Sequence, residues 1–185
     1  MKKNSSKAQS LDQLINRLSI FKIPKLIYFD CNSYYNNKRE VLDRIQQEFN
    51  NDTVVVRSSS LSEDCKNSSS AGVYESVLNI KTREVDSVTC AINAVINSYK
   101  KNNFYSQYDQ IIVQKMIKNT SMSGVIFTHD LNTGAPYYVV NYDDQSGLTD
   151  TVTSGGGRHS NRTLYIHRNS IDKLRSERFI HLLQA

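Results

Sequence analysis

Val54-Val55-Val56-Arg57-Ser58-Ser59-Ser60 joins three β-branched residues directly to an arginine and a row of serines. Branched side chains suit a pleated, packed surface, so the valines predict a short buried strand over residues 53–57. We expect Arg57 where this strand leaves the sheet, because open α/β sheets present ligand-binding groups at that edge. Its fork of donors suits phosphate oxygens, and the serine hydroxyls and loop amides after it can add neutral donors. Taken alone, the stretch fits a solvated strand end better than a binding site, so the other motifs decide between the two.

The composition is typical of a soluble globular protein. Its 185 residues suffice for one well-cored domain or for a piece of a larger one. Hydrophobic residues make up 38% and charged residues 22% of the chain, which excludes a disordered protein. No apolar run reaches membrane-spanning length, and the basic N-terminus does not lead into a signal-peptide core. We therefore expect a cytoplasmic protein without a membrane partner.

The cysteines and the net charge limit the classes of site. Cys31, Cys65 and Cys90 are widely spaced and form no Cys-x-x-Cys pair, so they predict buried or free thiols, not a disulfide framework or a zinc site. The net charge of +5 suits a polyphosphate ligand, an acidic partner or nucleic acid. Because no basic motif is interleaved with aromatic residues, nucleic acid is the weakest of these alternatives.

The hydrophobic pattern predicts a mixed fold of helices and strands. Apolar residues at helical spacing predict helices over residues 7–18, 37–49 and 84–100 and a further helix within 171–183. Strands are expected at residues 25–29, 53–57, 73–80, 111–117, 123–128, 137–142 and 163–167. Without an internal repeat or a low-complexity linker, residues 1–185 are interpreted as a single α/β (α+β) unit with antiparallel character in its second half.

Lys7 occupies an unusual place for a cation. Ser5 or Ser6 can cap the first helix, so Lys7 falls in its first turn, where the helix dipole disfavours positive charge. A lysine at this position can meet an anion that the same helix end attracts. A solvated surface lysine is the alternative that the residues alone leave open.

The order of several short motifs resembles one family, the nucleotide-binding domain of phosphoenolpyruvate synthase and pyruvate phosphate dikinase, which has an ATP-grasp fold. The resemblance runs from Lys7 to about Arg168, and each motif alone is weak, whereas their common order is specific. The motifs are Ser6-Lys7-Ala8-x-x-Leu11, Val54-Val55-Val56-Arg57-Ser58-Ser59, Glu63-Asp64, Ser70-Ala71-Gly72, Val113-Gln114-Lys115-Met116, Ser123-Gly124-Val125-Ile126-Phe127-Thr128-His129-Asp130 with Thr133-Gly134, and Gly147-Leu148-Thr149-Asp150-Thr151-Val152-Thr153-Ser154-Gly155.

The resemblance assigns roles around ATP to residues of several motifs. It implies that Lys7 and Arg57, with Ser58 beside it, contact the phosphates of ATP. Ser70, Ala71 and Gly72 would form a small-residue loop over the phosphates, where glycine permits close approach of the backbone. Gln114, Lys115 and Met116 would border the adenine, although Met116 equally fits an ordinary core position. Asp150 stands in place of a family glutamate near the nucleotide, and His129 replaces a common arginine and receives no role.

The resemblance also implies parts that the sequence does not contain. The family's Mg²⁺ ligands lie in a later Asp-x-Glu strand, and its carrier histidine lies on a separate swivelling domain. After Ser154 the carboxylates are Asp172 and Glu177, which do not have that spacing, and Asp143-Asp144 is interpreted as a solvated turn, not a metal pair. We therefore expect an ATP-grasp-like domain that is incomplete at its C-terminal end, with no catalytic or metal-binding residue in this chain. It would be the N-terminal part of a larger enzyme, with further domains or a complementing chain as partners.

These observations lead to two main hypotheses for function. The first is the ATP-binding part of a dikinase-type phosphotransferase, which cleaves ATP and passes a phosphoryl group through the carrier histidine to a small acceptor. The segments Gly134–Asp144, Thr149–Gly155 and Asn161–Leu164 resemble the glutamine kinase branch of this family. Because phosphoryl transfer depends on positioned Mg²⁺, we expect the isolated chain to be inactive. The alternative is a non-catalytic module that keeps the nucleotide fold for regulation or assembly.

Overall fold

The computed structural model describes residues 5–15, 17–60, 74–101, 105–154 and 162–173. The chain divides into two compact units, Met1–Met116 and Ile117–Ala185, and each is described by itself. This division describes compactness and does not test the interpretation of residues 1–185 as a single unit, which stays a prediction. The predicted α+β class is confirmed, because both units combine helices with antiparallel sheets.

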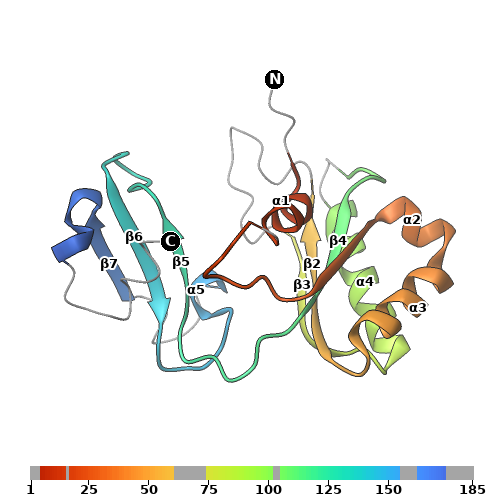
Figure 1. Ribbon diagram of the computed structural model, residues 1–185. Helices are drawn as coiled ribbons and strands as arrows, with labels where there is room; N and C mark the ends of the chain where they lie inside the picture. Colours follow the sequence, from red (N-terminus) through yellow and green to blue (C-terminus); the bar gives the residue numbers. More distant parts are fainter. Residues whose placement is uncertain (1–4, 16, 61–73, 102–104, 155–161, 174–185) are drawn as a thin grey trace. The chain divides into compact units, whose positions relative to one another are not determined.

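The first unit contains a four-stranded sheet (Figure 1). Its strands are β1 (Leu26–Asp30), β2 (Thr53–Ser59), β3 (Ser76–Lys81) and β4 (Gln110–Lys115), in the order β1-β4-β2-β3, and all neighbours are antiparallel. The strand prediction for residues 53–57 is therefore two residues too short. Arg57 does not lie at the strand end, because it pairs with Ile112 of β4 and Ser76 of β3. The edge rule for open α/β sheets describes parallel strands and does not apply to this antiparallel sheet.

The described residues of this unit form four helices: α1 (Lys7–Leu14), α2 (Cys31–Asn36), α3 (Lys38–Phe49) and α4 (Val85–Lys100). The helices expected at 37–49 and 84–100 are confirmed to within one residue at each end. The helix expected over 7–18 ends four residues earlier, at Leu14. The sequence pattern missed α2, which begins where the Asp30 carboxylate accepts a hydrogen bond from the Ser33 N–H at 2.6 Å.

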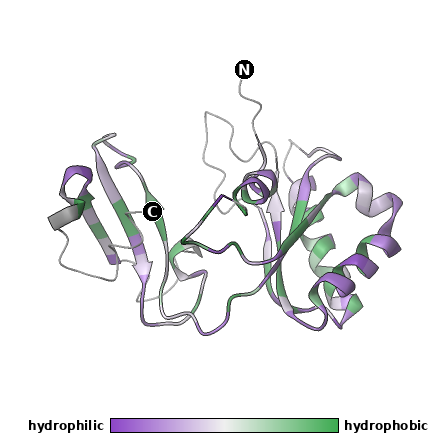
Figure 2. Cartoon of the chain, viewed as in Figure 1, coloured by the Kyte–Doolittle hydropathy of each residue, from purple (hydrophilic) through white to green (hydrophobic). Residues whose placement is uncertain are grey.

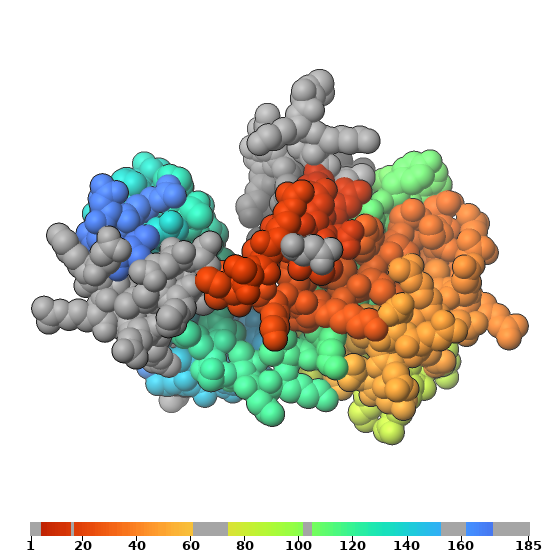
Figure 3. Space-filling model, viewed as in Figure 1, coloured from red at the N-terminus to blue at the C-terminus, as the bar shows by residue number. Residues whose placement is uncertain are grey.

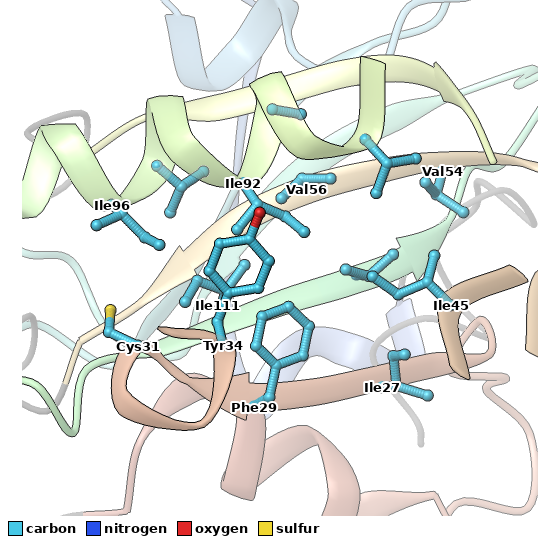
Figure 4. Packing of buried hydrophobic residues seen from close by; sticks show 14 of the residues in the cluster. Ile27, Phe29, Cys31, Tyr34, Ile45, Val54, Val56, Ile92, Ile96 and Ile111 are labelled. Atoms are coloured by element: carbon cyan, nitrogen blue, oxygen red, sulfur yellow. The ribbon is translucent and has the colours of Figure 1, made fainter. Parts of the chain in front are cut away.

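One face of the sheet packs against α2, α3 and α4 and forms the main core (Figure 4). Val54 and Val56 of β2 meet α4 residues such as Ile92, which is fully buried. Figure 2 shows hydrophobic residues along β4 and α4 and hydrophilic residues over much of α3. Alternation along each strand sends every second side chain into this core, so the intervening side chains belong to the other face.

α1 lies on that other face of the sheet, and in Figure 3 its residues and those that follow it, in red, lie at the surface of the first unit. The burial of Ser6 and Ala8, at 1% and 0% exposure, marks the side of α1 that meets the sheet. The sheet of the first unit thus has α2, α3 and α4 on the face that forms the main core and α1 on the other face.

The second unit contains a three-stranded antiparallel sheet in the order β5-β6-β7, formed by β5 (Ser123–Phe127), β6 (Tyr137–Asp143) and β7 (Arg162–His167). Its small core is centred on Val140 and Ile166. Gly124 is required where β5 meets β6, because a Cβ there would lie 2.3 Å from the Asn141 carbonyl oxygen. The unit also contains the short helix α5 (Thr151–Ser154) and a 3₁₀ helix over Arg168–Lys173. Most of the helix expected within 171–183 lies outside the described residues.

Within the part of the chain that the structure describes, no helix has both the length and the apolar character that a membrane crossing requires.

Candidate functional site

The sheet face that carries α1 brings together polar residues from β2 and β4, and we call it the α1 face. Val55, Arg57 and Ser59 of β2 alternate with core residues, so their side chains share this face. Their partners on β4 lie on the same face because cross-strand neighbours point the same way: Gln114, Ile112 and Gln110, respectively. The strand register therefore places Arg57 between Ser59 on one side and Val55 on the other.

Two hydrogen bonds join the first turn of α1 to the α1 face. The Ala8 N–H donates to the Ser59 hydroxyl at 2.8 Å, and the Ser6 hydroxyl donates to the Gln110 amide oxygen at 2.5 Å. Ser59 is fully buried and Ser6 is 1% exposed. Lys7 lies between Ser6 and Ala8 in the chain, so the structure places the backbone of Lys7 on the same face of the sheet as Arg57.

Three backbone donors at the start of α1 are already used inside the protein. The Ala8 N–H binds Ser59, the Gln9 N–H binds the Ser6 hydroxyl at 3.2 Å, and the Ser10 N–H binds the Ser6 carbonyl at 2.9 Å. These three amides are therefore engaged, and an anion at this helix end would need other donors, such as the Lys7 ammonium. The contact of Lys7 with phosphate stays a prediction.

Arg57 is half-buried on the α1 face. No hydrogen bond or ion pair joins its guanidinium to another residue within the described part of the chain. A guanidinium has five N–H donors, so Arg57 has the chemistry to bind an anionic ligand. Ser58, which was expected to assist Arg57, has the opposite parity and lies on the core face, paired with Ile111 at 3% exposure. The residue that shares the face of Arg57 is Ser59, and the alternation of β2 is the signal that identifies it.

Gln114, Lys115 and Met116 lie at the end of the first unit. Gln114 is 8% exposed on the α1 face, and its side-chain amide donates to the Pro24 carbonyl at 3.3 Å. The exposed Lys115 ammonium forms an ion pair with Asp52 at 2.7 Å. The backbone N–H groups of Lys115 and Met116 donate to the Lys25 and Thr53 carbonyls, both at 2.9 Å. These amides are therefore occupied within the sheet, and the role of the three residues beside adenine stays a prediction.

Asp150 belongs to the second unit, where it directly precedes α5 and is half-buried. The next residue, Thr151, donates its hydroxyl to the Asp143 carboxylate at 2.7 Å. Asp143 also accepts hydrogen bonds from the Gln145 and Ser146 amides and the Ser146 hydroxyl. These hydrogen bonds, those from Ser146 above all, hold the pKa of Asp143 well below its usual range.

The interpretation of Asp143-Asp144 as a solvated turn is wrong. Asp143 is 2% exposed and organises the turn after β6 through its hydrogen bonds. The Asp144 side chain is 8% exposed and forms an ion pair with Arg162 at 2.6 Å. Both carboxylates therefore have structural partners inside the second unit.

The remaining predicted parts of the site concern a loop and a metal. Ser70, Ala71 and Gly72 lie outside the described residues. Among the residues that the structure does describe, no group of three or more His, Cys, Asp or Glu side chains lies close enough to hold a metal ion. The described side chains thus do not by themselves provide a complete set of protein ligands for Mg²⁺.

Comparison with known proteins identifies relatives of the chain. Residues 35–177 match the family "Pyruvate phosphate dikinase, AMP/ATP-binding domain". This range includes Arg57, Gln114 and Asp150 but begins after Lys7. The chain is also similar to the "Uncharacterized phosphotransferase YvkC" of Bacillus subtilis (strain 168), with 36% identity over 119 residues. That match covers 56% of this chain and 13% of the relative, so the chain spans a small part of the relative's length.

Proposed function

The chain belongs to the pyruvate phosphate dikinase AMP/ATP-binding domain family, and from this premise we propose that it is the ATP-binding part of a dikinase-type phosphotransferase. The family supplies the nucleotide as ligand. The observation that carries the proposal is the α1 face, where the guanidinium of Arg57, which has no hydrogen-bond or ion-pair partner among the described residues, lies on the same side of the sheet as the helix turn that contains Lys7.

Arg57 and Lys7 would hold the phosphates of ATP in this proposal. A guanidinium can donate two parallel hydrogen bonds to phosphate oxygens, whereas an ammonium on a flexible stem acts as a mobile point charge. The two cations would neutralise charge on the bound triphosphate without a rearrangement of the sheet. Gln114, Lys115 and Met116 beside adenine, Ser70, Ala71 and Gly72 over the phosphates, and Asp150 near the nucleotide complete the proposed site.

The finer parts of the proposal concern the whole enzyme. The domain would have an ATP-grasp fold, and ATP bound to it would be cleaved with Mg²⁺ held mainly by residues beyond those described. The phosphoryl group would pass to a carrier histidine on another domain or chain and then to a small acceptor. Glutamine is the acceptor that the resemblance to the glutamine kinase branch favours.

Calorimetric titration with ATP tests the assignment of Arg57. We expect Arg57→Ala to raise the dissociation constant by about 10- to 100-fold, because charge-assisted hydrogen bonds contribute roughly 1.5–3 kcal/mol. Arg39→Ala is the matched control, because the Arg39 side chain is 97% exposed on α3. Equal affinities of the Arg57→Ala protein and the unaltered chain would contradict the assignment. ATP binding without turnover in the presence of every partner domain would favour the non-catalytic alternative.

A further inference from the structure

We propose that Ser59 is a positioning residue for nucleotide binding: its hydroxyl anchors the first turn of α1 and thereby holds Lys7 beside Arg57. This inference rests on the proposed function, since it takes Lys7 and Arg57 as the cations that meet the phosphates. Ser59 itself has no assigned contact with ATP.

The anchor is a single buried hydrogen bond between distant parts of the chain. Ser59 lies 51 positions after Ala8, and its hydroxyl accepts the Ala8 N–H at 2.8 Å with both residues fully buried. The second residue of a helix has no carbonyl partner inside the helix for its N–H group. Loss of the Ser59 hydroxyl would leave the Ala8 donor buried without a partner. This would destabilise the packing of α1 on the sheet.

Ser59 is itself held from the opposite side of the sheet. Its N–H donates to the Tyr99 hydroxyl at 2.8 Å, and that hydroxyl donates to the Gln110 carbonyl at 2.5 Å. Tyr99 comes from α4 and is 1% exposed. The Gln110 side chain in turn accepts the hydrogen bond from Ser6. These links connect the first turn of α1 through the sheet to α4.

The consequence for Lys7 follows from strand geometry. Ser59 and Arg57 are two residues apart on one face of β2, which corresponds to roughly 7 Å along the strand. Ser59 fixes the backbone on one side of Lys7, so it would keep the two cations on the same face of the sheet. A docked α1 is organised before the ligand arrives, which reduces the loss of conformational freedom on binding.

Hydrogen exchange tests the anchor without any nucleotide. In the unaltered chain we expect the Ala8 amide to be protected, and in Ser59→Ala we expect it to exchange at least about tenfold faster, as for a locally open segment. Thr82→Val is the matched control, because Thr82 is also fully buried and its hydroxyl donates to the Asp52 carbonyl at 3.1 Å, away from α1. Equal Ala8 protection in the unaltered, Ser59→Ala and Thr82→Val proteins would overturn the anchor.

A double-mutant cycle on ATP affinity tests the route through Lys7. We expect Ser59→Ala to raise the dissociation constant about 3- to 10-fold in the unaltered background and to have no further effect in Lys7→Gln, because residues that act as a unit are not additive. A merely structural serine would weaken binding equally in both backgrounds, and that additive result would overturn the proposal. So would unchanged affinity in a Ser59→Ala protein whose Ala8 amide has lost protection.

A second variant serves if Ser59→Ala does not fold. Ser6→Gly removes the hydrogen bond to Gln110 but keeps a residue type that is accepted at a helix N-cap. It should also weaken ATP binding only while Lys7 is present, and equal effects with and without Lys7 would contradict the proposal. If the unaltered chain binds no ATP, the proposed function fails and this inference with it, whereas Ala8 exchange separately reports whether the anchor exists.

Discussion

The two faces of the first sheet differ in what their side chains do. Toward α3 and α4, β2 contributes Val54 and Val56 to a continuous apolar core. Toward α1, the same strand contributes Arg57 and Ser59, which lie beside the polar groups of Gln110 and Gln114. Successive side chains of β2 point to opposite faces of the sheet, so a shift of one residue along the strand moves from one set to the other. One strand therefore carries both residues of the main core and the residues proposed for binding, and variants on the two faces should affect different measurements.

The largest expected effect on stability comes from the core face. Ile92 on α4 is fully buried in the main core, so Ile92→Ala should lower the free energy of unfolding by about 2–5 kcal/mol through lost burial and a cavity. Urea denaturation measures this change, and Ile20→Ala at a 63% exposed position is the control with the same chemical truncation. The ATP affinity of the folded Ile92→Ala protein should be unchanged, and a loss of affinity as large as that in Arg57→Ala would remove the distinction between the faces.

Arg57→Lys separates charge from geometry on the α1 face. The substitution keeps the positive charge but loses the planar fork, so we expect the dissociation constant for ATP to rise about 3- to 10-fold. The free energy of unfolding should change by less than about 0.5 kcal/mol, because the Arg57 side chain has no hydrogen-bond or ion-pair partner to lose among the described residues. Parallel calorimetry and urea denaturation measure the two quantities. A large loss of stability with unchanged affinity would place Arg57 in the scaffold instead.

Substitutions of Ser58 and Ser59 compare the two faces of the sheet at adjacent positions of β2. The sequence interpretation assigned a phosphate contact to Ser58, whereas the register favours Ser59 as the serine that affects binding. We expect Ser58→Ala to change the ATP dissociation constant less than Ser59→Ala does, and calorimetry on the two variants decides between them. A greater loss of affinity in Ser58→Ala would support the direct contact predicted from the sequence.

The last prediction concerns the reactivity of two cysteine thiols in the unaltered chain, which involves no change in stability or ATP binding. Cys31 is fully buried in the main core, and burial, with Asp109 and Asp30 nearby, raises the pKa of its thiol to about 12. Because the thiolate is the reactive form, Cys31 should resist alkylation at pH 8 in the folded chain. The exposed Cys90 should react readily. Peptide mapping after iodoacetamide treatment measures both residues, and rapid labelling of Cys31 would show that this core opens.

Local patterns predicted the elements better than their ends. The helical spacing of apolar residues identified α3 and α4 because each buries one stripe of side chains. The same criterion missed α2, whose polar sequence Cys31–Asn36 lacks such a stripe and depends on the Asp30 cap. The strand prediction for β2 stopped at Arg57 because Ser58 and Ser59 resemble loop residues. Their pairing with β4, more than fifty positions away, keeps them in the strand.

The residue types of the candidate site could be predicted from the sequence, but the hydrogen bonds between its residues could not. The positive charge of Arg57 and Lys7 and their places in the family's motif order predicted that they contact phosphate. The bond from Ala8 to Ser59 joins residues 51 positions apart, and no local pattern encodes such a contact. The burial of Asp143 likewise depends on Ser146 and Thr151 folding back over one carboxylate. Tertiary contacts of this kind determine which polar residues form hydrogen bonds inside the protein and which are positioned to contact a ligand.

The measurement that tests the central claim most directly is an NMR titration with ATP that follows side chains on both faces. We predict that the Arg57 Nε–H and the side-chain amides of Gln110 and Gln114 shift at low nucleotide concentration. The methyl groups of Ile92 and Ile96, buried beneath the opposite face, should change least. Shifts confined to the core-face methyl groups, or saturable ATP binding that leaves Arg57, Gln110 and Gln114 unchanged, would contradict the account.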